Sequence, residues 1–332
     1  MKAPGFWAVD PPTALARVLQ PLGGAYGAIA AWRMARPGLR VEKPVICVGN
    51  FTVGGAGKTP AAIAIAKLLI ATGEKVVFLS RGYGGAAGGT PIAVDPSRHS
   101  AGDVGDEPLL LARVAPTFVS PDRPMAAQAA IAAGADVLVL DDGLQNPSLA
   151  KDLSIAMIDG AFGFGNGLCL PAGPLRAPLA AQALHVALSV VVDASGARAS
   201  VICTALAGKP VTSARLEPDP SVAARLNGAR VLAFAGIGRP EKFFETLRTL
   251  GARAVVERGF PDHHRYEPSE LDALFAEAEA KSLIAVTTEK DFVRLPASHA
   301  QRAIALPVAL RFDDEPLIAR LLAEALARRR SG

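Results

Sequence analysis

Residues 48–60 read Val48-Gly49-Asn50-Phe51-Thr52-Val53-Gly54-Gly55-Ala56-Gly57-Lys58-Thr59-Pro60, and this stretch decides the fold. The apolar run before it, from Pro44 to Val48, predicts a buried strand, and the residues from Ala61 onward predict a helix. A strand, a glycine loop, Lys-Thr and a helix follow one another in phosphate-binding loops, whose backbone N–H groups surround phosphate oxygens at the positive end of the helix. Residues 52–59 are therefore candidate nucleotide-binding residues.

Lys58 and Thr59 supply the side-chain chemistry of such a loop. The lysine can reach the β- and γ-phosphates of a nucleotide, and the threonine hydroxyl can bind Mg²⁺. The strict pattern has glycine five residues before Gly57, where this chain has Thr52. An ordinary glycine-rich turn is the alternative, and Gly-Lys-Thr directly before a helix disfavours it.

The composition limits the class of protein. The chain has 332 residues, enough for two domains, and 50% of them are hydrophobic. Its net charge is +4, with one basic block at Arg328-Arg329-Arg330, which argues against a nucleic-acid partner. Three scattered cysteines without metal-ligand spacing disfavour disulfides and zinc, so the expected metal is Mg²⁺ on oxygen ligands.

The segment from Pro11 to Arg40 combines large apolar residues with arginines at helix-like spacing. The apolar set is Leu15, Val18, Leu19, Leu22, Tyr26, Ile29 and Trp32, and the arginines are Arg17, Arg33, Arg36 and Arg40. The uncharged run from Val18 to Trp32 is shorter than the roughly 20 residues that span a bilayer. No signal-peptide cleavage site follows it. Two interpretations stay open: a helix lying in a membrane interface, or a helix packed on its own domain.

From Lys43 to about Thr212, apolar strands alternate with helices such as Ala61–Ala71 and Met125–Gly134. The predicted strands are Val45–Val48, Lys75–Ser80, Thr117–Val119, Val137–Leu140, Ser154–Ile158 and Val186–Val192. This alternation predicts a P-loop NTPase-like, doubly wound parallel sheet. Binding loops in such sheets follow the strand ends, so the Gly- and Pro-rich loops Gly82–Gly89 and Asn166–Pro178 are expected to face the phosphate loop.

A boundary near Pro218 to Gly228 precedes a second, smaller Rossmann-like α/β unit. Its predicted strands are Val231–Ala235, Arg253–Glu257 and Leu283–Thr287, and its helices are Pro240–Leu250 and Pro268–Lys281. The predicted division is an N-terminal segment at 1–40, a phosphate-loop domain at 41–217 and a smaller domain at 218–332.

Acidic residues suggest the chemistry. Asp141 and Asp142 end an apolar strand, where an acid beside a phosphate loop holds Mg²⁺, although Asp-Asp-Gly is also a turn sequence. Asp106, before Glu107 and Pro108, has two interpretations: an N-cap of the following helix, or a carboxylate that takes a proton from an attacking hydroxyl group.

Histidines and cations complete the candidate set. His263 and His264 follow a strand of the second unit, where a polar loop or a histidine that approaches the phosphate site are both possible. Cations near a transferred phosphate stabilise it, and the loops offer them in Arg81-Gly82-Tyr83, Pro121-Asp122-Arg123 and Pro174-Leu175-Arg176.

Together these motifs resemble the tetraacyldisaccharide 4'-kinases, the lipid A 4'-kinases of Gram-negative bacteria. Besides the phosphate loop, the matching stretches are Ser80–Gly84, Gly105–Pro108, Asp141–Gln145, Leu170–Arg176, Ala235–Gly238, Phe260–His263 and Thr287–Asp291. The resemblance covers almost the whole chain, and the motifs occur in the family's order.

The resemblance implies transfer of the ATP γ-phosphate to the 4'-hydroxyl of a tetraacyldisaccharide 1-phosphate, giving lipid IVA, at the cytoplasmic face of the inner membrane. It implies ATP and Mg²⁺, and it makes the N-terminal helix a membrane-docking element. The implied catalytic residues are Asp106, His263 and Lys58. The implied nucleotide-binding residues are Thr52, Val53, Gly54, Gly55, Ala56, Gly57, Lys58 and Thr59. The implied metal ligands are Thr59, Asp141, Asp142 and Glu107, and the implied substrate contacts are Tyr83, Arg123, Gln145 and Arg176.

Two positions depart from the family pattern. Ala177 stands where the family often has glutamate, and Asn146 stands where it often has histidine, so neither receives a role. A membrane-associated partition ATPase is the competing function, but it requires a lysine where this chain has Val53. A metallochaperone or cobyrinate-type synthetase would favour His/Cys clusters or an amide-handling site, and the sequence has neither.

Overall fold

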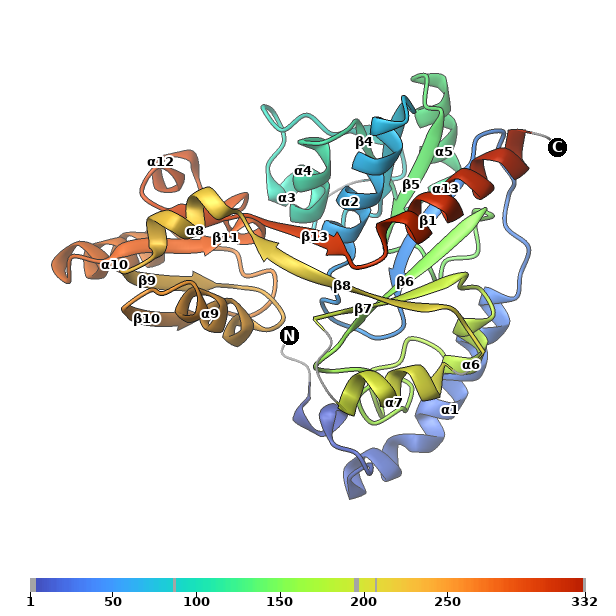
Figure 1. Cartoon of the computed structure of the whole chain (residues 1–332), viewed down its shortest axis with the longest axis horizontal. Helices are drawn as coiled ribbons and strands as arrows, with labels where there is room; N and C mark the ends of the chain where they lie inside the picture. Colours follow the sequence, from blue (N-terminus) through green and yellow to red (C-terminus); the bar gives the residue numbers. More distant parts are fainter. Residues whose placement is uncertain (1–3, 86–87, 194–196, 207, 331–332) are drawn as a thin grey trace.

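The computed structural model describes residues 4–85, 88–193, 197–206 and 208–330, so residues 86 and 87 of the predicted glycine-rich loop lie outside it. Two α/β domains of unequal size lie next to each other (Figure 1). The larger contains a nine-stranded sheet and the smaller a four-stranded sheet. The predicted fold class is confirmed.

The large sheet has the strand order β13-β8-β7-β6-β1-β5-β2-β4-β3. All strands from β8 to β4 run parallel, and the edge strands β13 and β3 run antiparallel to their neighbours. The bounds are β1 Val45–Asn50, β2 Val76–Ser80, β3 Ile92–Ala93, β4 Thr117–Val119, β5 Val137–Asp141, β6 Leu153–Asp159, β7 Leu188–Val192, β8 Val211–Pro218 and β13 Val308–Phe312. Every residue of β1 is buried, which explains its unbroken apolar run.

Helices cover both faces of the large sheet, as in doubly wound folds. One face packs against α2 (Lys58–Ala71), α4 (Asp106–Ala112) and α13 (Glu315–Arg330). The other packs against α5 (Arg123–Ala132), α6 (Leu179–Ala183) and α7 (Ala197–Ala205). The short helices η1 (Gly5–Ala8) and α3 (Ala101–Val104) and the long helix α1 (Ala14–Met34) complete the larger domain.

The smaller domain has a fully parallel sheet in the order β10-β9-β11-β12. Its strands are β9 Arg230–Ala235, β10 Ala254–Gly259, β11 Ile284–Thr288 and β12 Ile304–Leu306. Its helices are α8 Pro220–Leu226, α9 Pro240–Thr249, α10 Pro268–Ala280, α11 Glu289–Phe292 and α12 Ala297–Ala300. Two apolar clusters, one on each face of this sheet, form its core.

The strands and helices predicted from the sequence are all present, and their ends shift by a few residues. The largest shift is at α2, which begins at Lys58 instead of Ala61. The helix therefore starts inside the phosphate-loop motif, and this brings its positive end closer to the loop.

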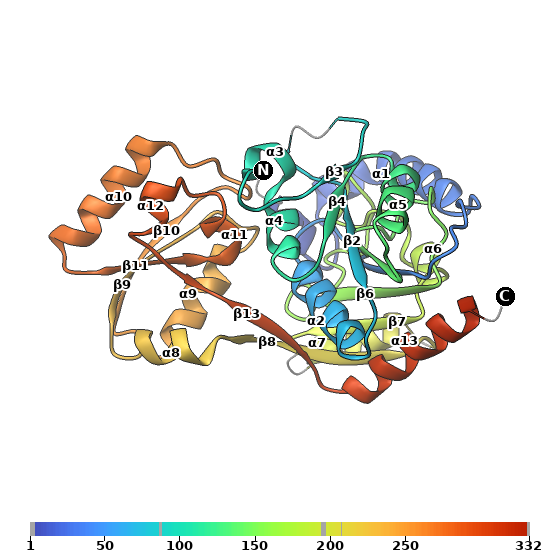
Figure 2. The same cartoon turned by 90° about the horizontal axis from the view of Figure 1, so that it is seen from above.

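The predicted boundary of the smaller domain is wrong for its last residues. Strand β13 pairs antiparallel with β8, from Val308 opposite Pro218 to Phe312 opposite Ala214, and so returns the chain to the large sheet. The two strands run between the domains, and α13 then lies on the larger one (Figure 2). Ile318 and Leu322 of α13 are buried in the same core as α2. Burying this apolar face is the physical reason for the return.

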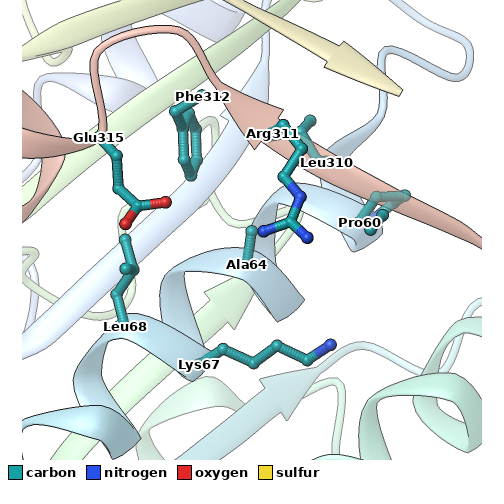
Figure 3. A pocket seen from close by; sticks show the side chains of 9 residues that line it. Pro60, Ala64, Lys67, Leu68, Leu310, Arg311, Phe312 and Glu315 are labelled. Carbon is teal, nitrogen blue, oxygen red and sulfur yellow. The ribbon is translucent and has the colours of Figure 1, made fainter. Parts of the chain in front are cut away.

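A surface hollow of about 250 Å³ lies between α2 and the returning segment (Figure 3). Lys67, Arg311 and Glu315 line it together with apolar residues that include Leu310 and Phe312.

Helix α1 packs on the larger domain through its small residues. A Cβ atom added at Gly23 would lie 2.7 Å from the Cys169 carbonyl oxygen, and one added at Gly27 would lie 2.9 Å from Cys169 Sγ. Leu22, at 61% exposure, and Ile29, at 60%, face outward, whereas Leu19 is half-buried. The helix therefore packs on its own domain, as one interpretation predicts, and leaves large apolar side chains exposed, while the membrane-interface interpretation stays a prediction.

Leu322→Ala tests the placement of α13. A buried leucine truncated to alanine costs about 2–5 kcal/mol, so we expect the larger domain to lose that free energy of unfolding in urea denaturation. Arg320→Ala on the exposed side of the same helix is the matched control and should change stability by less than about 0.5 kcal/mol. Equal stability of Leu322→Ala and wild type would show that α13 does not belong to this core.

Candidate active site

The phosphate loop follows β1 and is fixed at both ends. Asn50, buried at the end of β1, donates from Nδ2 to the Gly54 carbonyl oxygen at 3.1 Å. The Val53 N–H donates to the Pro174 carbonyl oxygen at 2.9 Å, which places the predicted loop 166–178 against the phosphate loop. Gly54 (φ +116°) and Gly57 (φ +77°) adopt backbone angles that favour glycine, so the loop can curve with its N–H groups free to face an anion.

Thr59 and Asp141 come together as the sequence predicts for a magnesium site. The Thr59 hydroxyl donates to Asp141 Oδ2 at 2.8 Å. Asp141 is buried, and its other oxygen, Oδ1, has no hydrogen-bond partner among the described residues. Burial, with the neighbouring Asp142, raises the pKa of Asp141 to about 6. An unpartnered buried oxygen beside a hydroxyl group fits Mg²⁺, which prefers oxygen ligands.

Asp142 forms the charged centre of the same group. Arg176 binds its carboxylate with two hydrogen bonds, NH1 to Oδ1 at 2.7 Å and NH2 to Oδ2 at 3.0 Å, and Lys58 Nζ lies 3.7 Å from Oδ2. Burial raises the pKa of Asp142, but the charges of Lys58 and Arg176 outweigh it and lower the pKa to about 2. The φ of +57° at Asp142 is costly for a non-glycine residue, and such strain is commonly retained at functional sites.

Lys58 lies over its own loop. Its Nζ donates to the Gly54 carbonyl oxygen at 3.3 Å, while burial lowers its pKa and the charge of Asp142 opposes that shift. The ammonium group is thus held at the mouth of the loop, where it can meet a phosphate oxygen.

Two glutamines and an arginine support the loop from behind. Gln145 Nε2 donates to the Asn50 carbonyl oxygen and to Gln182 Oε1, both at 2.7 Å. Gln182 in turn donates to the Phe51 carbonyl oxygen at 3.2 Å. Arg123 is only 3% exposed and interacts electrostatically with Asp141 and Asp142. Its guanidinium group lies near these acids, and its contact with substrate stays a prediction.

The two positions that depart from the family pattern have local structural contacts. Ala177 is buried, and its carbonyl oxygen accepts from Gln182 Nε2 at 2.6 Å. Asn146 Oδ1 accepts from the Ser148 N–H at 2.8 Å. Both residues therefore have structural roles in this chain.

Asp106 is the first residue of α4, and its prediction as an N-cap is wrong. Gly105 occupies the N-cap position with φ +91°, which leaves the Asp106 side chain free to reach across to the smaller domain. Its Oδ2 lies 3.0 Å from His263 Nδ1 and 3.2 Å from Arg294 Nε. Burial raises the pKa of Asp106, but hydrogen bonds from Glu107 and His263 and the charge of Lys290 hold it well below its usual range.

Three further groups surround this pair. Lys290 Nζ lies 2.8 Å from Glu107 Oε1 and 3.2 Å from His263 Nε2, and the Tyr83 ring lies 5.2 Å from the imidazole. Burial and the hydrogen bond with Asp106 raise the pKa of Glu107 to about 7, and the hydrogen bond with Asp106 raises that of His263 against the effect of burial. The ion pair of Glu107 with Lys290 competes with the predicted role of Glu107 as a metal ligand.

His264 points away from this group. Its Nε2 lies 2.7 Å from Glu270 Oε2, and its ring stacks on Phe260 at 4.8 Å. Of the two neighbouring histidines, only His263 faces the candidate active site, as the family pattern implies.

The cluster around Lys58 at the phosphate loop and the cluster around Asp106 face each other. The charge of Glu107 contributes to the pKa of Lys58, so the two groups lie within electrostatic range. On the smaller domain, Gly238 lies directly over the phosphate loop, since a Cβ atom added there would lie 3.9 Å from the Gly55 nitrogen. A phosphate bound by the loop would therefore lie between the two domains.

Sequence reasoning missed Lys290 and Arg294. Lys290 lies in the segment Thr287–Asp291, which matches the family but offered no chemistry on its own. Arg294, three residues beyond Asp291, had no local signal. Only the contact with α4 places these two cations at the candidate active site, and that contact joins residues far apart in the sequence.

The fold and the two facing groups define a two-domain, phosphate-loop nucleotide-binding protein. The sequence model of the tetraacyldisaccharide-1-P 4'-kinase (LpxK) family matches residues 15–327, and the chain belongs to this family. The tetraacyldisaccharide 4'-kinase of Methylobacterium sp. (strain 4-46) is 56% identical over 100% of both chains. That of Methylorubrum populi is 55% identical over 99% of this chain and 100% of the relative.

A solved relative has the same fold. LpxK from Aquifex aeolicus, crystallised in complex with ATP, superposes with a TM-score of 0.74 at 26% identity. The match covers 94% of this chain and 99% of the Aquifex chain.

The raised pKa of Asp141 predicts a dependence of stability on pH. A carboxyl group whose pKa rises from 3.8 to about 6 on folding stabilises the folded state below pH 3.8 and loses that contribution as the pH rises through about 6. The side chain of Asp141→Asn does not ionise. Without Mg²⁺, the free energy of unfolding of this variant minus that of wild type should therefore increase by about 1–3 kcal/mol as the pH rises from about 4 to about 7. Urea denaturation measures this difference. A difference that stays constant over the range would contradict the assigned burial of this charge.

Proposed function

We propose that this protein transfers the γ-phosphate of ATP to the 4'-hydroxyl of a tetraacyldisaccharide 1-phosphate, which gives lipid IVA in lipid A biosynthesis. The observation that carries the proposal is the placement of the Asp106–His263 pair opposite Lys58 and Thr59. A phosphate loop alone serves switches and hydrolases as well. A buried carboxylate facing the loop supplies the hydrogen-bond acceptor that an attacking hydroxyl group needs. Membership in the kinase family sets aside the partition ATPase.

At the nucleotide end, the loop residues 52–57 bind the phosphates through backbone N–H groups, and Lys58 contacts the transferred group. Thr59 and Asp141 would hold Mg²⁺, which neutralises charge on the β- and γ-phosphates when bound. Arg176 and Lys58 keep Asp142 ionised beside this position. Most of the rate gain in such transfers comes from positioning and charge stabilisation, which this arrangement supplies.

At the acceptor end, Asp106 accepts a hydrogen bond from the acceptor hydroxyl group. The low pKa of Asp106 keeps it ionised at neutral pH but makes it a weak base. Because the transition state of phosphoryl transfer is loose, the hydroxyl proton leaves late and strong basicity is not required. Orientation of the hydroxyl group toward phosphorus is therefore the main task of Asp106, and His263 holds the carboxylate in place.

The function is tested by ATP turnover with purified protein and Mg²⁺. We expect turnover to require the acylated disaccharide, and Asp106→Asn to lower kcat by about 10²–10⁴ because it removes the ionised carboxylate that orients the acceptor hydroxyl group and receives its proton. His263→Ala should also lower kcat. The matched control is His264→Ala, since His264 is a neighbour with similar exposure that points away.

Turnover that is independent of the disaccharide would contradict a lipid kinase. Equal losses at His263 and His264, or a loss only at His264, would contradict the assigned site. Melting temperatures of each variant show whether a lost rate reflects lost folding.

We further propose that α1 docks the protein on the cytoplasmic face of the inner membrane. Among the described residues, no helix has the length and apolar content needed to cross a bilayer. The outward side of α1 instead carries Leu22, Ile29 and Trp32, each about 60% exposed, and Arg36 stacks on the Trp32 ring at 3.8 Å. Large apolar side chains flanked by arginines suit an anionic membrane interface, and an acylated substrate resides there.

Leu22→Glu with Ile29→Glu tests membrane docking. Burial of each large apolar side chain is worth about 1.5–3 kcal/mol, so two charges should move the protein from vesicles of anionic phospholipid to the supernatant. ATP binding should persist, because α1 lies outside the phosphate loop. The matched control is Ile70→Glu, an exposed apolar residue on α2. Sedimentation of the double variant with vesicles at the wild-type level would contradict the proposal.

A further inference from the structure

The segment Thr287–Asp291 matches the family but has no part in the function described so far. Thr287 anchors it, since its hydroxyl donates to the Phe234 carbonyl oxygen at 2.7 Å inside the smaller domain. Thr288 then caps α11 by accepting from the Asp291 N–H at 3.1 Å. Helix α11 packs against α4 of the larger domain (Figure 2). The anchored segment thus places Lys290, on α11, at the interface between the domains.

The Lys290 ammonium group lies among four site side chains. Its Nζ is 2.8 Å from Glu107 Oε1, 3.2 Å from His263 Nε2, 3.7 Å from Asp262 Oδ1 and 3.9 Å from Asp106 Oδ2. The groups around it come from α4 and from the loop after β10. Among the described residues, all polar contacts of Nζ within 4 Å are with these side chains.

The ammonium group also bears on where His263 carries its proton. An ammonium group donates hydrogen bonds and accepts none, so in the neutral form of His263 the Nε2 atom is the acceptor of the contact with Lys290. A neutral imidazole then has its proton on Nδ1, 3.0 Å from Asp106 Oδ2. The Lys290 ammonium group and the Asp106 carboxylate therefore favour the same neutral tautomer of His263.

Arg294, the other cation of this group, has a structural role. It is more buried than Lys290, and it donates to the backbone carbonyl oxygens of His264 and Gly236, both at 3.0 Å, as well as contacting Asp106. These backbone bonds hold the loops of the smaller domain together. Lys290 Nζ has no such backbone bond among the described residues, so its loss should disturb the orientation of the site more than the fold.

We propose that Lys290 is a positioning residue for phosphoryl transfer, which holds His263 in the orientation and tautomer that fix the Asp106 carboxylate. The proposal rests on the proposed kinase activity. Lys290 acts through His263 and Asp106, and it does not contact the nucleotide.

Lys290→Met tests this role by keeping the length of the side chain and removing its charge. We expect kcat to fall about 10- to 100-fold, because small misplacement of a reacting group has effects of this size. The KM for ATP should stay within about twofold of wild type, and Lys290→Arg should recover part of the rate because it keeps the charge. The matched control is Lys281→Met, which removes an exposed lysine of the same domain that pairs with Glu277 and should retain the wild-type rate.

A double variant separates positioning from an independent role. If Lys290 acts through Asp106, adding Lys290→Met to Asp106→Asn should lower kcat by less than about twofold more. Losses that multiply, a wild-type kcat for Lys290→Met, or a raised KM for ATP with unchanged kcat would each overturn the proposal. A wild-type protein that does not phosphorylate the disaccharide would instead contradict the proposed function, so the two failures are distinguishable.

Discussion

The site depends on one buried carboxylate. Asp106 is 3% exposed, and an ionised carboxylate at that depth is stable only with opposite charges and hydrogen bonds around it. Asp106 belongs to the larger domain, whereas His263, Lys290 and Arg294, which supply those partners, belong to the smaller one. Neither domain can complete this cluster alone, and the interface between the domains is therefore part of the candidate active site.

Two ion pairs between the domains lie at the edge of the large sheet where the phosphate loop also lies. Asp159 ends β6 and pairs with Arg239, and Asp193 follows β7 and pairs with Lys242 at 2.5 Å. Both acids lie at the carboxyl ends of parallel strands, where the phosphate loop also follows β1. Ligands of open α/β sheets bind at this edge, so docking of the smaller domain and binding of the phosphates are geometrically linked.

Local patterns in the sequence predicted the parts of the protein that local physics determines. Lys58 and Thr59 could be found because they follow a buried strand and its glycine-rich turn, and Asp141 because it ends a buried strand. The return of β13 to β8 could not, since it pairs Phe312 with Ala214 across an entire domain. Lys290 was missed for the same reason. The N-terminal apolar residues were recognised, but their outward orientation was not predicted. That orientation arises because Gly23 and Gly27 of α1 pack against Cys169, which lies far along the chain.

The most direct measurement is a crystal structure of the protein with Mg²⁺ and a non-hydrolysable ATP analogue. We expect the γ-phosphate beside Lys58 and Thr59, with space for one hydroxyl group between its phosphorus atom and the Asp106 carboxylate. His263 and Lys290 should still surround Asp106 in that complex. A γ-phosphate that lies on the side of the loop away from Asp106, or an Asp106 that binds the metal ion directly, would contradict the assignment of Asp106 to the acceptor hydroxyl group.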